Sequence, residues 1–213
     1  MGVLVTEVQP EAVGKKEIMK VVTIDVVRHG EKNGDQMTEK GFAQISATGL
    51  ALARTAGHMK VSRLIYSGAN RTRQAVTIFK EAFEFEDGPE ENKMFGFGNL
   101  IAPAGGLERV LKEIAYVQAN GDTVAHALNE SEYAVMARLQ IAEALIELAK
   151  DMIVKDQNWA IVASHGNYSE MATVDPQMPY GICEGDRVRY TIREDGRIIS
   201  TTLHRCPIPG GRN

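Results

Sequence analysis

The chain has 213 residues, of which 44% are hydrophobic and 24% are charged, and its formal net charge at pH 7 is -4. These values are typical of a globular protein with a hydrophobic core and argue against disorder along the whole chain. A mildly acidic protein has no overall attraction for nucleic acid or for an anionic membrane surface, so we expect neither as a partner.

Signals for targeting and redox chemistry are few. No stretch approaches the roughly 20 apolar residues of a membrane span, and the first 20 residues lack the apolar segment of a secretion signal. Gly2 and Thr6 match the loose spacing of a myristoylation site, which leaves lipidation of Gly2 open. Cys183 and Cys206 form no C-x-x-C pair, so we expect reduced thiols in a cytoplasmic protein.

The first half of the chain predicts alternating strands and helices. Residues 1–18 are aperiodic and predict a poorly ordered N-terminal arm. The β-branched run over residues 21–27 is nearly all apolar, as in a strand buried on both faces of a parallel sheet. A helix is expected from Thr38, a suitable N-cap, to about Gly57. A second strand follows over residues 63–66 and a second helix over 71–83.

The second half begins with a less regular segment, residues 84–130, rich in turn-forming glycine and proline. We expect this segment to be an insertion over one end of the sheet, with a short helix near 106–117. The later elements are a long amphipathic helix over 131–155, with Leu139 among its regularly spaced apolar residues, a third buried strand at 159–164, and a hairpin with strands at 187–193 and 197–204. This order predicts a single domain over 19–213, folded as a three-layer α/β/α sandwich with a mostly parallel sheet.

Polar side chains follow three of the expected strands, at the point where each strand ends. The first strand leads into Arg28-His29-Gly30, the second into Ser67 and then Arg71, and the third into Ser164-His165-Gly166. Ligands of open α/β sheets bind outside the carboxyl ends of the strands. A lone histidine or arginine at such a place is usually an ordinary surface residue, but the recurrence predicts that two histidines and two or three arginines, with Arg73 as the third, meet at one edge.

Such a cluster suits phosphoryl transfer. A phosphate dianion requires concentrated positive charge, and the planar arginine fork fits two phosphate oxygens. A neutral imidazole is a competent nucleophile when a hydrogen bond to its other nitrogen fixes its tautomer. We therefore expect chemistry that requires no metal ion and no other cofactor.

Four segments, in this order, resemble motifs of the histidine phosphatase superfamily, also called the phosphoglycerate mutase-like family. Arg28-His29-Gly30 resembles the superfamily signature, and Thr38-Glu39-Lys40-Gly41 is similar to its Leu-Thr-x-x-Gly helix start. Residues 67–75 resemble its Ser-x-x-x-Arg-x-x-Gln segment, and residues 162–166 its Val-x-Ser-His-Gly strand end. Together these matches span residues 21–170.

The resemblance implies a role for each matched residue. His29 would be the nucleophile that becomes phosphorylated, Arg28 and Arg71 would bind the phosphoryl group, and His165 would complete the pocket.

The acid that protonates the leaving group is less clear from the sequence. Many members of the superfamily carry a glutamate four residues before the glycine of an aromatic-glycine pair. Here Phe95-Gly96 fits that pair, but Asn92 occupies the glutamate position. We expect the neighbouring Glu91 to be the acid, with Glu108 as second candidate, and a site with no acid stays open.

The activity expected from the resemblance is that of a phosphomonoesterase of the histidine acid phosphatase type, acting on a small phosphorylated substrate. Gly166-Asn167 departs from the phytase-like branch, which places an aspartate directly after the second histidine. The spacing over residues 31–35 departs from the mutase branch. Two alternatives remain: a phosphoglycerate mutase-type phosphoryl transferase, and a catalytically inactive phosphate-binding module on the same fold.

Overall fold

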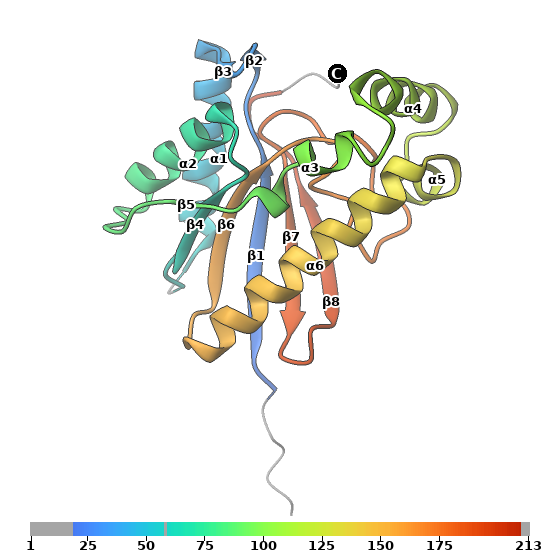
Figure 1. The fold of residues 1–213 in the computed structure, drawn as a ribbon. Helices are drawn as coiled ribbons and strands as arrows, with labels where there is room; N and C mark the ends of the chain where they lie inside the picture. Colours follow the sequence, from blue (N-terminus) through green and yellow to red (C-terminus); the bar gives the residue numbers. More distant parts are fainter. Residues whose placement is uncertain (1–18, 58, 210–213) are drawn as a thin grey trace, which may run out of the picture.

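A six-stranded sheet forms the centre of the molecule, in the order β5-β4-β6-β1-β7-β8 (Figure 1). The computed structural model describes residues 19–57 and 59–209, so the expected N-terminal arm and Gly2 lie outside the described residues. The first four strands in that order pair in parallel, and β7 and β8 add an antiparallel edge. The strands are β1 (Val21–Arg28), β4 (Arg63–Tyr66), β5 (Glu90–Glu91), β6 (Trp159–Ser164), β7 (Arg187–Arg193) and β8 (Ile198–His204).

The register of β1 against β6 positions the site. Every residue of β6 is buried, which fits the apolar run predicted there. The parallel pairing runs from Thr23 opposite Trp159 to Arg28 opposite Ser164. Because the two strands end at the same level, His29 and His165 both follow at the carboxyl edge of the sheet.

Helices cover both faces of the sheet and make three layers (Figure 1). Helices α1 (Glu39–Thr55) and α2 (Asn70–Ala82) pack on one face, and α6 (Glu132–Val154) crosses the other. Side chains of β1 alternate accordingly: Ile24 and Val26 belong to the core under α6, and Val27 to the core under α1 and α2. The predicted α/β/α sandwich is confirmed.

Local capping agrees with the sequence. The Thr38 side chain accepts a hydrogen bond from the backbone N–H of Gly41 at 3.1 Å, and Gly57 adopts a φ of 57° just after α1. In α6 the apolar spacing predicted that Leu139 is buried, but its side chain is 67% exposed. Small residues such as Ala137 and Ala144 instead form much of the buried face, and their size allows close approach to the sheet.

Residues 84–130 contain more structure than the sequence indicated. They hold β5, the 3₁₀ turn η1 (Lys93–Phe95), α3 (Gly98–Ile101), α4 (Leu107–Asn120) and α5 (Val124–Glu130). The expected helix near 106–117 corresponds to α4, which lies near the carboxyl ends of the central strands (Figure 1). A short hairpin, β2 (Lys32–Asn33) with β3 (Gln36–Met37), was not predicted; its strands are too short to give a pattern.

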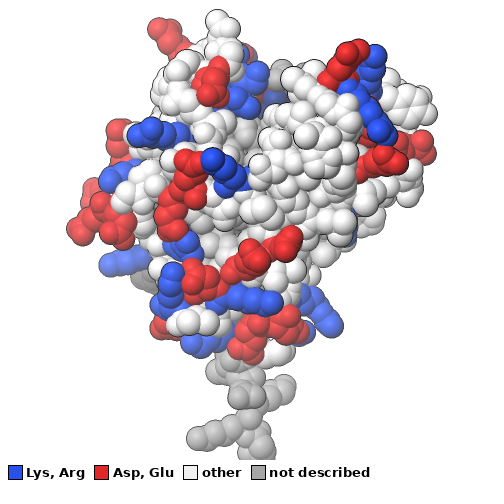
Figure 2. Space-filling view, in the orientation of Figure 1, with Lys and Arg blue, Asp and Glu red and all other residues white. Residues whose placement is uncertain are grey.

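Surface charge is mixed on the face that carries α6. Acidic and basic side chains are interspersed there, and an uncharged area lies over the N-terminal half of this helix (Figure 2). Within residues 19–57 and 59–209, no helix has both the length and the apolar character needed to cross a bilayer.

Candidate active site

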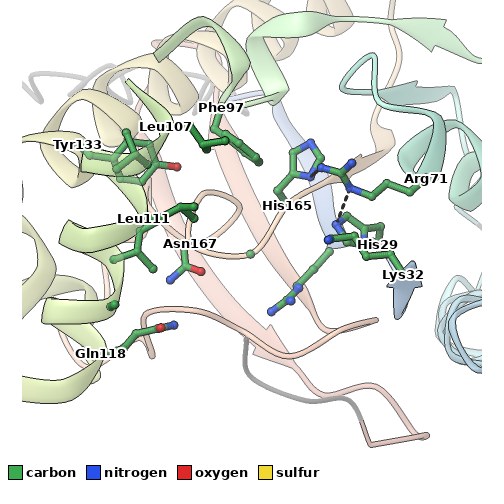
Figure 3. A pocket seen from close by; sticks show the side chains of 15 residues that line it. His29, Lys32, Arg71, Phe97, Leu107, Leu111, Gln118, Tyr133, His165 and Asn167 are labelled. Atoms are coloured by element: carbon green, nitrogen blue, oxygen red, sulfur yellow. Dashed lines mark hydrogen bonds between the residues drawn. The ribbon is translucent and has the colours of Figure 1, made fainter. Parts of the chain in front are cut away.

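The His29 ring is held in one orientation by its own turn. Its Nδ1 lies 2.7 Å from the carbonyl oxygen of Gly30, which can only accept a hydrogen bond, so Nδ1 carries the proton. Arg71 donates from Nε to the His29 Nε2 at 3.0 Å (Figure 3). The lone pair of His29 Nε2 therefore points toward Arg71.

The second histidine lies against the first. The ring centroids of His29 and His165 are 5.3 Å apart, with the planes at 73°. Arg71 Nη2 lies 3.3 Å from His165 Nδ1 and donates to it, while His165 Nε2 lies 2.8 Å from Ser67 Oγ. Thr72 Oγ1 donates to the carbonyl oxygen of Ala69 at 2.7 Å, so Ser67 Oγ, 3.1 Å away, donates to Thr72 and accepts from His165. One guanidinium group thus contacts both imidazoles.

Burial keeps both imidazoles neutral. It is the largest cause that lowers the pKa of His29 from the ordinary 6.5 to about 3. The hydrogen bond to Gly30 raises the pKa, and the nearby charges, Arg71 first among them, lower it further. Burial also lowers the pKa of His165 well below its usual range, with His29 and Arg71 adding to the effect. A neutral His29 carries an unprotonated lone pair on Nε2, as a nucleophile requires, and this lone pair accepts the hydrogen bond from Arg71.

Arg28 is buried beside the histidines and is held from the far side. Its Nη2 donates to Glu184 Oε1 at 3.0 Å, in an ion pair whose side chains are each 5% exposed. Its Nη1 donates to the carbonyl oxygen of Ile182. Gly166 passes so close that an added Cβ would lie 2.7 Å from Arg28 Nη1. Glycine at this position is therefore required by the close approach of the arginine.

The unpredicted hairpin contributes two charged residues. Asp35 accepts from Arg71 Nη1 at 2.7 Å and from the backbone N–H of Asn70 at 3.2 Å, which fixes the guanidinium from outside. Lys32 lines the same cavity as the two histidines. These contacts hold Arg71 next to both imidazoles and place a further cation at the site.

A cavity of about 350 Å³ opens beside these residues, and we call it the site cavity. Its basic side is formed by Arg28, His29, Lys32, Arg71 and His165. Across from it, Leu107, Val110, Leu111 and Ile114 of α4 form an apolar surface, which we call the α4 wall. Figure 3 shows Leu107 and Leu111 opposite His29 and Arg71. Phe97, Tyr133, Gln118 and Asn167 also line the cavity.

The two candidate acids are both held in ion pairs. Glu91 accepts from the Tyr66 hydroxyl at 3.3 Å and forms an ion pair of 3.5 Å with Lys93. The Glu108 side chain is 85% exposed and pairs with Lys112 at 2.8 Å. Neither glutamate is among the residues that line the site cavity.

The sequence identified the residues at the strand ends, and the structure brings His29, His165, Arg71 and Arg28 to one cavity. Nothing in the sequence indicated Glu184, which is 156 residues from Arg28, or the α4 wall. Ser67 was marked by its motif, but its contact with His165 was not. Asn33-Gly34 is a turn signal that could have suggested the hairpin carrying Lys32 and Asp35.

Comparison with known proteins shows similarity of structure alone. No protein-family model matches the sequence, and no curated protein does. A phosphoglycerate mutase from Bacillus anthracis is similar with a TM-score of 0.59 at 14% identity, over 87% of this chain and 92% of that chain. A phosphoserine phosphatase from Entamoeba histolytica, in complex with 3-phosphoglyceric acid, gives 0.55 at 13% identity, over 87% and 98%. The protein histidine phosphatase SixA, complexed with tungstate, gives 0.50 at 12% identity, over 86% and 95%.

These structures include both phosphatases and a mutase, so the likeness establishes the architecture rather than one reaction. The layer order and the sheet of the present chain agree with it. The chain has the phosphoglycerate mutase-like fold.

Proposed function

We propose that this protein is a phosphoric monoester hydrolase that acts through a phosphohistidine on His29 without a metal ion. The observation that carries the proposal is the state of the His29 ring. The Gly30 carbonyl holds the proton on Nδ1, and burial keeps the imidazole neutral, so the lone pair of Nε2 can attack once Arg71 turns its hydrogen bond to the phosphate. A nucleophile with a defined tautomer next to a guanidinium group is the arrangement that phosphoryl transfer requires.

In the first step, the phosphoryl group enters the site cavity and Arg71 moves its hydrogen bonds from the imidazoles to phosphate oxygens. His29 Nε2 then attacks phosphorus as the bond from phosphorus to the leaving oxygen breaks; the electron pair of that bond stays on the oxygen, which takes up a proton from solvent. Arg71, held by Asp35, and the buried Arg28 stabilise the charge on the oxygens in the transition state. Asp35 and Glu184 hold the two guanidinium groups at the cavity before the substrate arrives, which lowers the cost of reorganisation.

In the second step, water attacks the phosphorus of the phosphohistidine, and the bond from phosphorus to Nε2 breaks. Inorganic phosphate leaves and His29 returns to its neutral state. A bound dianion raises the pKa of a neighbouring imidazole, so His165 can gain a proton while the phosphate is present and lose it afterwards. Ser67 keeps the His165 ring in place through this cycle.

The phosphorylated substrate in this proposal is a small molecule, because the site cavity has the size typical of small-molecule sites. We also propose a cytoplasmic location, with which the free thiols of Cys183 and Cys206 agree.

The test is a panel of phosphomonoesters with release of inorganic phosphate as the readout, in the presence of a chelator. The wild type is expected to release phosphate and to form an acid-labile, alkali-stable phosphoprotein. His29→Ala should do neither, while His126→Ala, on α5 and outside the residues that line the site cavity, should behave as wild type. Circular dichroism checks that both variants fold.

The same panel separates the alternatives. Transfer of the phosphoryl group between positions of a phosphoglycerate, with little phosphate released, would establish a mutase instead. Binding of phosphate without turnover of any ester would establish an inactive binding module. Loss of activity on chelation would contradict the metal-independent mechanism.

A further inference from the structure

Two features of the site cavity together indicate a class of substrate: the apolar α4 wall, and the lack of a carboxyl group among the described residues that line the cavity. One side carries the cations and imidazoles, and the other is the α4 wall, made of aliphatic side chains (Figure 3). Leu107 and Leu111 are 49% and 56% exposed, although they border a polar site. Aliphatic side chains left open to solvent beside a phosphate site gain free energy when an apolar part of a substrate covers them.

The second feature is the absence of a proton donor of carboxyl type. None of the described residues that line the site cavity is an aspartate or a glutamate. A neighbouring polar cavity shares Arg71, Phe97 and His165 with it, and its described lining likewise contains no carboxyl group. Glu108 pairs with Lys112 and belongs to neither lining. Glu91 is outside the lining of the site cavity but borders the neighbouring cavity, because it pairs with Lys93, and its Oε1 would lie 3.3 Å from a Cβ added to Gly68; both of these residues line that cavity.

Because no carboxyl group is among the described residues that line the site cavity, the leaving group that can depart over the α4 wall is limited. An aliphatic alkoxide is a poor leaving group unless it is protonated as it departs, whereas a phenolate, with a conjugate acid of pKa about 10, departs with its negative charge. Apolar alkyl phosphates would cover the α4 wall, but their alkoxide leaving group needs a proton that no carboxyl group in the cavity supplies. Small acyl phosphates have a leaving group that departs without a proton, but they would leave the α4 wall uncovered.

We propose that the substrates are aryl phosphate monoesters, whose aromatic group packs on the α4 wall and leaves as the aryl oxide. This proposal rests on the phosphohistidine mechanism proposed above. The bond from His29 Nε2 to phosphorus forms, the bond from phosphorus to the aryl oxygen breaks, and its electron pair stays on that oxygen. The aryl oxide takes a proton from solvent, and water later hydrolyses the phosphohistidine to inorganic phosphate and neutral His29.

Four substrates separate the effect of an apolar group on the substrate from the effect of the basicity of the leaving group. 1-Naphthyl phosphate is apolar with a leaving group of low basicity, and hexyl phosphate is apolar with a basic one. Acetyl phosphate is small with a leaving group of low basicity, and glycerol 3-phosphate is polar with a basic one. We expect kcat/KM for 1-naphthyl phosphate to exceed that for glycerol 3-phosphate by at least about a thousandfold, with the other two between them. A phosphotyrosine peptide added to the set distinguishes a protein-borne aryl phosphate from a free one.

A variant of the α4 wall tests where the aromatic group lies. Leu111→Asn should raise KM for 1-naphthyl phosphate about tenfold, because part of the apolar contact is lost, and should leave acetyl phosphate unchanged. Tyr116→Asn is the matched control, since Tyr116 is 54% exposed on the same helix and does not line the site cavity. It should not alter KM for either substrate.

The outcomes also distinguish this proposal from the one on which it rests. If glycerol 3-phosphate is hydrolysed as fast as 1-naphthyl phosphate through the His29 phosphoenzyme, the aryl proposal is wrong and the phosphohistidine mechanism stands. Equal effects of Leu111→Asn on 1-naphthyl and acetyl phosphate would also overturn it. If phosphate is released from none of these substrates, the phosphohistidine mechanism itself is overturned.

Discussion

The buried, neutral His29 has a measurable effect on stability as the pH falls. In the unfolded chain a histidine binds a proton as the pH passes below about 6.5, whereas His29 in the folded protein binds one only near pH 3. Between these values the unfolded state binds more protons than the native state, so the free energy of unfolding falls as the pH is lowered. Above about pH 6.5 both states are neutral at this residue, and its contribution is fully present.

The size of the effect follows from the shift. One pH unit within that window costs about 1.4 kcal/mol for a single group. Lowering the pH from about 7.5 to about 5.0 therefore removes about 2 kcal/mol through His29 alone. At pH 5 most carboxyl groups are still ionised, which makes this window more informative than a more acidic one. His165, whose pKa is lowered in the same direction, adds a loss of the same sign.

Urea unfolding followed by the fluorescence of Trp159 measures this loss. Trp159 is the single tryptophan of the chain and is completely buried, so its signal reports on unfolding of the core. His29→Gln removes the titrating group, while all other groups are common to both proteins. Between about pH 7.5 and about 5.0 we expect the variant to lose about 2 kcal/mol less than the wild type. Equal losses in the two proteins would show that His29 titrates normally in the folded state, and the reasoning about its neutral nucleophile would fail.

Three further predictions concern the residues around the imidazoles. Arg71→Lys should lower kcat by about a hundredfold, because the planar fork that contacts both histidines is lost, and Arg73→Lys on the same helix should have little effect in the same phosphate-release assay. Glu184→Gln should lower the free energy of unfolding by about 3 kcal/mol in urea titrations, since it leaves the Arg28 charge buried without its counter-charge; an unchanged midpoint would show that this ion pair is dispensable. Gly166→Ala should displace Arg28 and lower kcat/KM at least about tenfold, whereas Gly88→Ala, with no atom within 4 Å of the added Cβ, should match the wild type; equal kinetics of the two would contradict the close approach.

The sequence predicted the layers and most helices and strands because their signals are local. The apolar run of β6 and the N-cap at Thr38 are features of consecutive residues. The convergence of His29 and His165 could also be inferred, since parallel strands end at the same edge of a sheet.

What could not be predicted depends on distant residues or on weak patterns. The partner of Arg28 is Glu184, which follows no motif and is brought close only by the completed fold. The same holds for the α4 wall, because an amphipathic helix shows which of its faces is apolar but not that this face borders a phosphate site. Leu139 illustrates the opposite error, in which regular spacing placed an exposed side chain on the buried face.

The place of β1 in the sheet has a consequence for biosynthesis. This N-terminal strand is central and pairs with β6 and β7, which end at Ser164 and Arg193. During translation, both edges of β1 can therefore be paired only after Arg193 has left the ribosome. Long-range pairing of this kind slows folding and leaves an apolar strand open to aggregation until its partners arrive.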